Sequence, residues 1–317
     1  MLRINKIEKT AKLNRDELFR FGVALLFIVG IMLFTLVRVE SGTHVVLLVI
    51  SAMIGGYMAM NIGANDVANN VGPAVGSHTI TLTGAVLLAV IFEAAGALIA
   101  GGDVVGTIKK GIIDPALITD ADTFIWLMTA ALLAAALWLN IATALGAPVS
   151  TTHSIVGGVL GAGIAAGGWG IADWGEVGKI AASWVISPVL GGFIAAAFLY
   201  LIKRTVTYKD DVMGAAKRVV PLLIAVMAWA FGTYLMLKGV THIWKVSFGL
   251  AALIGLGVAA VVYLLIRPQV RKTSDRLPNE KESVNELFTI PLIFAAALLS
   301  FAHGANDVAN AVGPLAG

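Results

Sequence analysis

The chain has 317 residues, of which 58% are hydrophobic and only 13% are charged, and its net charge is +3. This composition excludes a soluble globular domain and predicts a polytopic helical protein embedded in the lipid bilayer. The Lys and Arg residues of a membrane protein chiefly set its orientation, so the small positive charge does not indicate nucleic-acid binding. The chain contains no cysteine, which excludes disulfides and thiolate metal sites.

The hydropathy pattern predicts five consecutive parts. They are a cytoplasmic basic tail over 1–20, an extra membrane helix and its link over 21–43, a first transport repeat over 44–202, two connecting helices with basic loops over 203–286, and the start of a second repeat over 287–317.

Two proline positions are expected to break membrane helices. The apolar run over 44–71 would be about 42 Å long as a helix, which exceeds the roughly 30 Å hydrocarbon core. Gly72-Pro73 is expected to end this helix, because proline lacks the backbone N–H and restricts the residue before it. Ser187-Pro188 is expected to interrupt a second span, over 179–202.

The distribution of positive charge predicts the orientation. If the spans alternate from a cytoplasmic N-terminus, 16 of the 22 Lys and Arg residues fall on the inside. The span ending near residue 73 then runs inward, and the one ending near 314 runs outward. Opposite polarity of this kind is typical of secondary transporters. We therefore expect an all-α, polytopic transporter of the plasma or inner membrane, with inverted repeats and broken or re-entrant helices.

An eleven-residue motif occurs twice. Gly63-Ala-Asn-Asp-Val-Ala-Asn-Asn-Val-Gly-Pro73 returns as Gly304-Ala-Asn-Asp-Val-Ala-Asn-Ala-Val-Gly-Pro314, with ten identical positions. An ionisable side chain at membrane depth costs about 3 kcal/mol or more, so each Asp indicates a functional site. One helical turn gathers a carboxylate and several amide oxygens, which are hard donors suited to Na⁺. The alternative is a polar clamp between packed helices.

A second motif, Pro148-Val-Ser-Thr-Thr-His153, predicts a helix start that could hold an anion. It could also be an ordinary capped helix, and His153 could be a further donor or only a polar neighbour. The predicted spans carry no Lys or Arg except at their ends, so a buried anion would need co-bound cations. Glu93 could coordinate a cation, relay a proton or belong to a hydrogen-bonded pair.

With these motifs in view, the chain resembles the inorganic phosphate transporter (PiT) family of sodium- or proton-coupled phosphate symporters. The resemblance rests on both Asn-Asp copies, the Ser-Thr-Thr-His motif and the segment Trp184-Val-Ile-Ser-Pro188. It implies Na⁺ ligands at Asn65, Asp66, Asn306 and Asp307, and phosphate ligands at Ser150, Thr151, Thr152, Asn69 and Asn310. Glu93 and His153, singled out above from the residues themselves, are the candidates for coupling. It also implies a homodimer and no cofactor beyond the coupling Na⁺, with H⁺ as the alternative.

The last residue, Gly317, follows closely on the second copy, before a second Ser-Thr-Thr segment of the family could occur. We therefore expect the sequence to be a fragment that does not transport by itself. Alternative functions are symport of phosphate with H⁺ or as a metal complex, and a sulfate permease on the same scaffold. A channel, or an intramembrane hydrolase that uses Ser150 and His153, is less consistent with the doubled motif, and we do not expect an enzyme.

Overall fold

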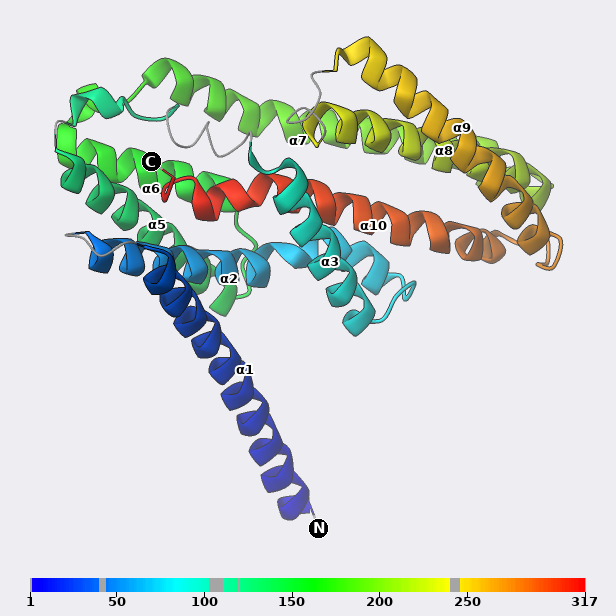
Figure 1. Cartoon of the computed structure of the whole chain (residues 1–317). Helices are drawn as coiled ribbons and strands as arrows, with labels where there is room; N and C mark the ends of the chain where they lie inside the picture. The colour runs from blue at the N-terminus through cyan, green and yellow to red at the C-terminus, as the bar shows by residue number, and fades with distance from the viewer. Residues whose placement is uncertain (1, 40–43, 103–110, 119, 240–245, 317) are drawn as a thin grey trace. The chain divides into compact units, whose positions relative to one another are not determined.

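The structure is a computed structural model that describes residues 2–39, 44–102, 111–118, 120–239 and 246–316 (Figure 1). Within this part of the chain, every element longer than five residues is an α-helix. Eight of the described helices are long and apolar enough to cross a membrane. The prediction of an all-α, polytopic membrane fold is therefore confirmed. Residues 40–43 of the expected link and residues 103–110 of the expected first repeat lie outside the described residues.

The helices extend further than the hydropathy pattern predicts. The elements are α1 (Leu2–Arg38), α2 (Val45–Gly76), α3 (Leu82–Ala100), η1 (Pro115–Leu117), α5 (Ala121–Ala144), α6 (Thr151–Gly167), η2 (Trp169–Ile171), α7 (Trp174–Ile202), the π-helical turn η3 (Lys203–Thr207), α8 (Val212–Lys238), α9 (Phe248–Ser274) and α10 (Lys281–Val312). Residues 267–274 and 281–286, which lie in the region of connecting helices and basic loops predicted over 203–286, are therefore helical. Long charged side chains can reach water from a helix end.

The two prolines that were expected to break helices lie inside continuous helices instead. α2 continues past Pro73 and α7 continues past Pro188, so both predicted breaks are wrong. A proline removes one backbone donor, and membrane helices compensate for this loss by local adjustment and by packing. α2 ends where His78 adopts a φ of +57° and the amide of Thr79 donates to the carbonyl oxygen of Ala74 at 3.0 Å.

The chain forms two compact units. Unit 1 contains Met1–Asp66, Ile108–Ala172 and Asn310–Gly317, and unit 2 contains Val67–Thr107 and Asp173–Ala309. α2 and α10 each contribute to both units. Each copy of the repeated Asn-Asp motif is consequently divided between the two units.

In unit 1, α5 and α6 form a tight helical hairpin. A Cβ atom at Gly158 of α6 would lie 2.6 Å from the carbonyl oxygen of Ala131 in α5, so glycine permits this close approach. Gly146, with a φ of +69°, allows the chain to turn after α5. At the opposite end of the hairpin, the amide of Asp114 donates to the carbonyl oxygen of Ile171 at 2.9 Å. This bond holds the entering and leaving segments together.

A ladder of polar pairs joins α2 to α5 in unit 1. The pairs are Ser51 with Thr129, Asn61 with Asn140 and Asn65 with Thr143, at 2.7, 3.1 and 2.8 Å. The partners are 78 or 79 positions apart in every pair, so the two helices run parallel. Parallel neighbours agree with the predicted alternation of spans, in which one intervening span separates α2 from α5.

In unit 2, η3, α8, α9 and α10 share one apolar core, which includes the buried residues Val206, Val220, Ile224, Val270 and Leu287. Branched aliphatic side chains from four elements fill this core, and their burial is the main favourable term in such packing. The unit is therefore a helical bundle with its own interior.

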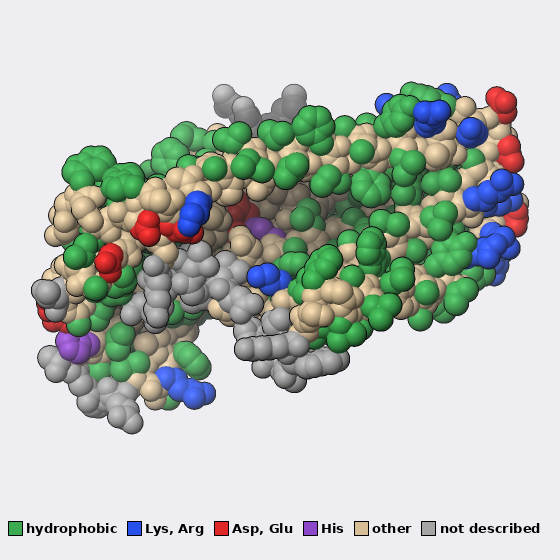
Figure 2. Space-filling model, turned by 90° about the horizontal axis from the view of Figure 1, so that it is seen from above, with side chains coloured by type: hydrophobic (Ala, Val, Ile, Leu, Met, Phe, Trp, Pro, Cys, Tyr) green, Lys and Arg blue, Asp and Glu red, His purple; other side chains and the backbone are tan. Residues whose placement is uncertain are grey.

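Two basic segments of unit 2, residues 203–218 and residues 267–286, meet at one end of its bundle. Lys217 Nζ lies 2.5 Å from Asp275 Oδ1. Asn279 Oδ1 accepts from the amide of Met213, and Asn279 Nδ2 donates to the carbonyl oxygen of Asp210, each at 3.0 Å. Figure 2 shows Lys, Arg, Asp and Glu side chains gathered at this end, with apolar side chains along the helices. The shared end agrees with the predicted alternation of spans, which places most Lys and Arg residues on the inside.

α3 and α10 cross closely in unit 2, because a glycine lies at both contact positions. A Cβ atom at Gly96 would overlap the carbonyl oxygen of Phe301, and one at Gly304 would overlap the backbone of Glu93. Gly304 is the first residue of the second motif copy. The motif glycine therefore brings Glu93 of α3 against α10.

Candidate functional site

The first turn of α6 is built by signals that can be read in the sequence. Pro148 precedes the helix, and Ser150 is its N-cap, with Oγ accepting a hydrogen bond from the amide of His153 at 3.2 Å. The predicted helix start at this motif is confirmed. The orphan amides of a first helical turn carry partial positive charge, which favours a negative group nearby.

Asp66 of α2 lies at this positive helix end in unit 1. The hydroxyl of Thr151 donates a hydrogen bond to Asp66 Oδ2. The side chains are deeply buried, since Asp66 is 6% exposed and Thr151 is 2% exposed. Burying a carboxylate is costly unless donors or opposite charge accompany it. The Thr151 hydroxyl supplies a donor, and the start of α6 supplies partial positive charge.

Asn310, from the second copy of the motif, reaches the same turn of α6. Its Nδ2 donates to Thr152 Oγ1 at 3.2 Å, and the residue is 1% exposed. Consecutive threonines thus contact side chains from the two motif copies: Thr151 contacts Asp66 of the first, and Thr152 contacts Asn310 of the second. These four residues lie within unit 1.

Asn65 contacts the connection between α5 and α6. Its Nδ2 donates to Thr143 Oγ1 at 2.8 Å and to the carbonyl oxygen of Ala147 at 3.3 Å. Its Oδ1 accepts from the amide of Val149 at 3.2 Å. Asn65 is buried, so both ends of its carboxamide bond to protein groups.

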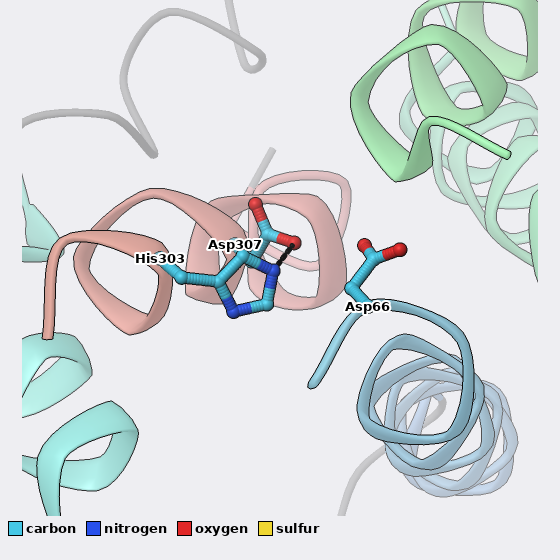
Figure 3. A group of neighbouring side chains, drawn as sticks. All are labelled: Asp66, His303 and Asp307. Carbon is cyan, nitrogen blue, oxygen red and sulfur yellow. Dashed lines mark ion pairs between the residues drawn. The ribbon is translucent and has the colours of Figure 1, made fainter. Parts of the chain in front are cut away.

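A second polar cluster forms in unit 2 around Glu93. Asn70 Nδ2 donates to Glu93 Oε1 at 2.9 Å, and His303 Nδ1 lies 3.2 Å from the same oxygen. The other ring nitrogen of His303 lies 2.8 Å from Asp307 Oδ2, as the dashed line in Figure 3 marks. Asn306 Nδ2 donates to Asp307 Oδ1 at 3.0 Å. Glu93 therefore belongs to a hydrogen-bonded cluster that links α2, α3 and α10.

The sequence candidates fall into two groups, one within each unit. Asp66, Thr151, Thr152 and Asn310 converge in unit 1, and Glu93 and Asp307 meet in unit 2 through His303. Ser150, His153, Asn69 and Asn306 are exposed.

Three residues of these clusters are absent from the predicted site residues: Asn70, Thr143 and His303. The i, i+4 spacing of His303 and Asp307 places both on one helix face, and this signal could have identified the histidine.

Comparison with known proteins identifies the family of the chain. A family model described as "Phosphate transporter family" matches residues 62–317. A Helicobacter pylori (strain J99) protein named "Putative phosphate permease" is 52% identical over 313 residues, which is 99% of this chain and 59% of that protein. A Chlamydia trachomatis protein of the same name is 40% identical over 293 residues, which covers 86% of this chain and 69% of the relative.

A solved structure titled "The sodium-dependent phosphate transporter" has the same fold. It is 36% identical, with a TM-score of 0.80, and the match covers 86% of this chain and 66% of that one. The chain spans about 59% of the length of the Helicobacter relative. Because the family model covers most of the chain and its relatives are phosphate permeases by name, the chain belongs to the phosphate transporter family, a family of transporters rather than enzymes.

Proposed function

We propose that the protein containing this chain carries inorganic phosphate across a membrane, and that the start of α6 in unit 1 is part of its phosphate site. One observation carries the proposal. Thr151 and Thr152 contact Asp66 and Asn310, which come from the two copies of the repeated motif. A site to which both halves of a duplicated sequence contribute is what an alternating-access carrier requires.

The chemistry of this turn suits a tetrahedral oxyanion. The hydroxyls of Ser150, Thr151 and Thr152 lie beside the first-turn amides of α6, and helix N-termini bind phosphate and sulfate readily. Asp66 favours phosphate over sulfate, because a phosphate that carries a proton can donate a hydrogen bond to the carboxylate. Sulfate has no proton to donate at neutral pH, so the same carboxylate would repel it.

The test is uptake of radiolabelled phosphate into proteoliposomes that contain the intact protein, with excess sulfate as competitor. We expect phosphate uptake that sulfate inhibits weakly. Equal or stronger inhibition by sulfate would assign the site to a sulfate permease instead.

We propose Na⁺ as the coupling ion, with Asp66 in unit 1 and Asp307 in unit 2 each serving as a charged cation ligand. A co-bound cation lowers the cost of burying an anion. A solved relative is sodium-dependent by its title, which supports this choice. Uptake that follows an imposed Na⁺ gradient supports Na⁺ coupling, whereas uptake that follows voltage alone would indicate a channel.

Proton coupling is the second candidate, and His303 is the observation that favours it. A neutral imidazole has a single N–H, yet both ring nitrogens of His303 face carboxylates, those of Glu93 and Asp307. This pair of contacts needs an imidazolium or a protonated carboxylate, so the cluster holds an exchangeable proton. Uptake in Na⁺-free medium under an inward proton gradient would favour H⁺ over Na⁺.

The remaining proposals concern assembly and orientation. We propose a homodimer in the plasma or inner membrane, two inverted repeats and a cytoplasmic N-terminus. Because the chain has no cysteine, single cysteines placed at the two ends of one span can be labelled from either side to test the orientation. Ser150 serves as an N-cap, so a hydrolytic role for it with His153 has little support.

A further inference from the structure

We propose that Asn65 is a positioning residue that holds the connection between α5 and α6 in place, and that it is not a ligand of the coupling cation. The inference rests on the proposed phosphate site at α6. It reassigns a residue whose place in the motif suggests cation binding.

The first step concerns the hydrogen bonds that the Asn65 carboxamide makes. The two N–H groups on Nδ2 serve Thr143 Oγ1 at 2.8 Å and the carbonyl oxygen of Ala147 at 3.3 Å. The oxygen, which is the atom a cation would need, accepts from the amide of Val149 at 3.2 Å. Asn65 is 8% exposed, so these bonds form away from solvent. Three of its four hydrogen-bonding positions are therefore committed to protein.

The second step is that the backbone of the connection between α5 and α6 needs hydrogen-bond partners. Gly146 ends α5 in a left-handed conformation, and the amide of Ala147 donates back to the carbonyl oxygen of Ala142 at 2.8 Å. Pro148 has no backbone donor to offer. The carbonyl of Ala147 and the amide of Val149 thus lie in irregular backbone, which a membrane protein must satisfy by other means. The Asn65 carboxamide bonds to both, as a peptide group of a neighbouring strand would.

The third step links this contact to the site. Val149 immediately precedes the N-cap Ser150, so Asn65 fixes the start of α6 against α2. Asp66 is the next residue of α2, and it accepts the hydrogen bond of Thr151. A shift of the connection would therefore move Thr151 relative to Asp66. Asn65 acts on phosphate through the position of α6 rather than by touching a cation.

Substitution of Thr143 distinguishes a positioning role of Asn65 from a role as cation ligand. Its hydroxyl accepts a hydrogen bond from Asn65, and Thr143 is not a proposed cation ligand. The experiment compares Asn65→Ala, Thr143→Val, the double variant and Thr143→Ser in proteoliposomes of the intact protein. We expect each of the first two to raise the KM for phosphate on the order of tenfold, as expected for an unsatisfied buried partner, with a smaller change in kcat. The double variant should be no worse than the worse single one, and Thr143→Ser should restore the wild-type KM.

The Na⁺ concentration for half-maximal uptake, measured at saturating phosphate, should stay unchanged in all four variants. A tenfold or larger increase of this value in Asn65→Ala, with Thr143→Val unaffected in its phosphate KM, would overturn the proposal in favour of a cation ligand.

A second measurement does not depend on transport. Hydrogen–deuterium exchange of the purified protein should be faster across residues 145–152 in Asn65→Ala, because the amide of Val149 loses its acceptor. Asn69→Ala, an exposed asparagine one turn further along α2, is the matched control and should leave exchange there unchanged. Unchanged exchange in Asn65→Ala would contradict the positioning role. A wild-type protein that takes up no phosphate would contradict the proposed function, but not the positioning role of Asn65.

Discussion

Asn310 of α10 donates a hydrogen bond to Thr152 of α6 at 3.2 Å, across 158 positions of the sequence. The hydroxyl of the neighbouring Thr151 donates a hydrogen bond to Asp66 of α2. The first turn of α6 therefore contacts both copies of a motif whose occurrences are 241 positions apart. A duplicated motif would not need to converge in this way if each copy only clamped its own helix neighbours.

Replacing Asp66 tests the charge at the centre of this arrangement. Asp66→Asn keeps the shape and still offers an oxygen to Thr151, but it removes the negative charge that a cation or a protonated phosphate would meet. We expect cation-driven phosphate uptake to fall about 100-fold or more, given the strength of hydrogen bonds to charged groups. Radiolabelled uptake and size-exclusion profiles measure function and folding separately. A folded variant with wild-type uptake would contradict the proposed role of Asp66.

The contact between Asn310 and Thr152 can be measured by a double-mutant cycle. We expect Asn310→Ala and Thr152→Val each to raise the phosphate concentration that gives half-maximal uptake. The interaction energy between the two substitutions should be about 0.5–2 kcal/mol. Thr152→Ser retains the hydroxyl and should behave as wild type. Strictly additive effects of the two substitutions would show that the pair does not act together on phosphate.

Local features of the fold could be predicted because they depend on neighbours in sequence. The long apolar runs indicated the membrane helices, and Pro148 with Ser150 indicated where α6 begins. The prediction from local sequence was wrong at Pro73. Proline disfavours helices, yet Pro73 lies within the continuous helix α2. The loss of a single backbone donor is small beside the cost of exposing irregular backbone in a membrane, and only the surrounding packing decides between them.

Long-range pairing within the candidate site could not be predicted. The motif presents asparagines at several positions of one helix, and periodicity alone does not say which of them faces a partner. Asn70 is buried against Glu93, whereas Asn69 is exposed. The pairing of Glu93 with His303 spans 210 positions, and it depends on the close crossing of α3 and α10.

Gly304 sets this crossing, which gives a prediction about stability. Gly304→Ala places a Cβ atom into the backbone of Glu93, so we expect a loss of about 1–3 kcal/mol as the helices separate. Gly257→Ala in α9 is the matched control, because no atom lies within 4 Å of that Cβ position. It should be neutral or stabilise the helix by up to about 1 kcal/mol. Thermal unfolding in detergent distinguishes the two, and equal melting temperatures would refute the close crossing.

Asp120, the N-cap of α5, gives a prediction about acid pH. The side-chain hydroxyl and the backbone amide of Thr123 donate to its carboxylate at 2.7 and 2.9 Å and lower the pKa of Asp120. A lowered pKa in the folded state means that the ionised cap stabilises α5 above about pH 4, and that this contribution is lost as the pH falls further. Asp120→Asn keeps an acceptor but cannot ionise. Amide exchange in the first turn of α5 should accelerate below about pH 4 in the wild type and not in this variant; the same acceleration in both would contradict the assignment.

His303 gives the sharpest test of how the unit 2 cluster contributes to coupling. His303→Gln cannot bridge Glu93 and Asp307 as a cation, so two carboxylates lose their shared partner. We expect the maximal rate of phosphate uptake to fall about tenfold, in line with the loss of one charge-assisted hydrogen bond. His153→Gln is the matched control, because His153 is exposed on α6, and it should keep the wild-type maximal rate. A reduced rate in His153→Gln with an unchanged rate in His303→Gln would move the coupling role to α6, and the bridge between the two carboxylates would then be structural.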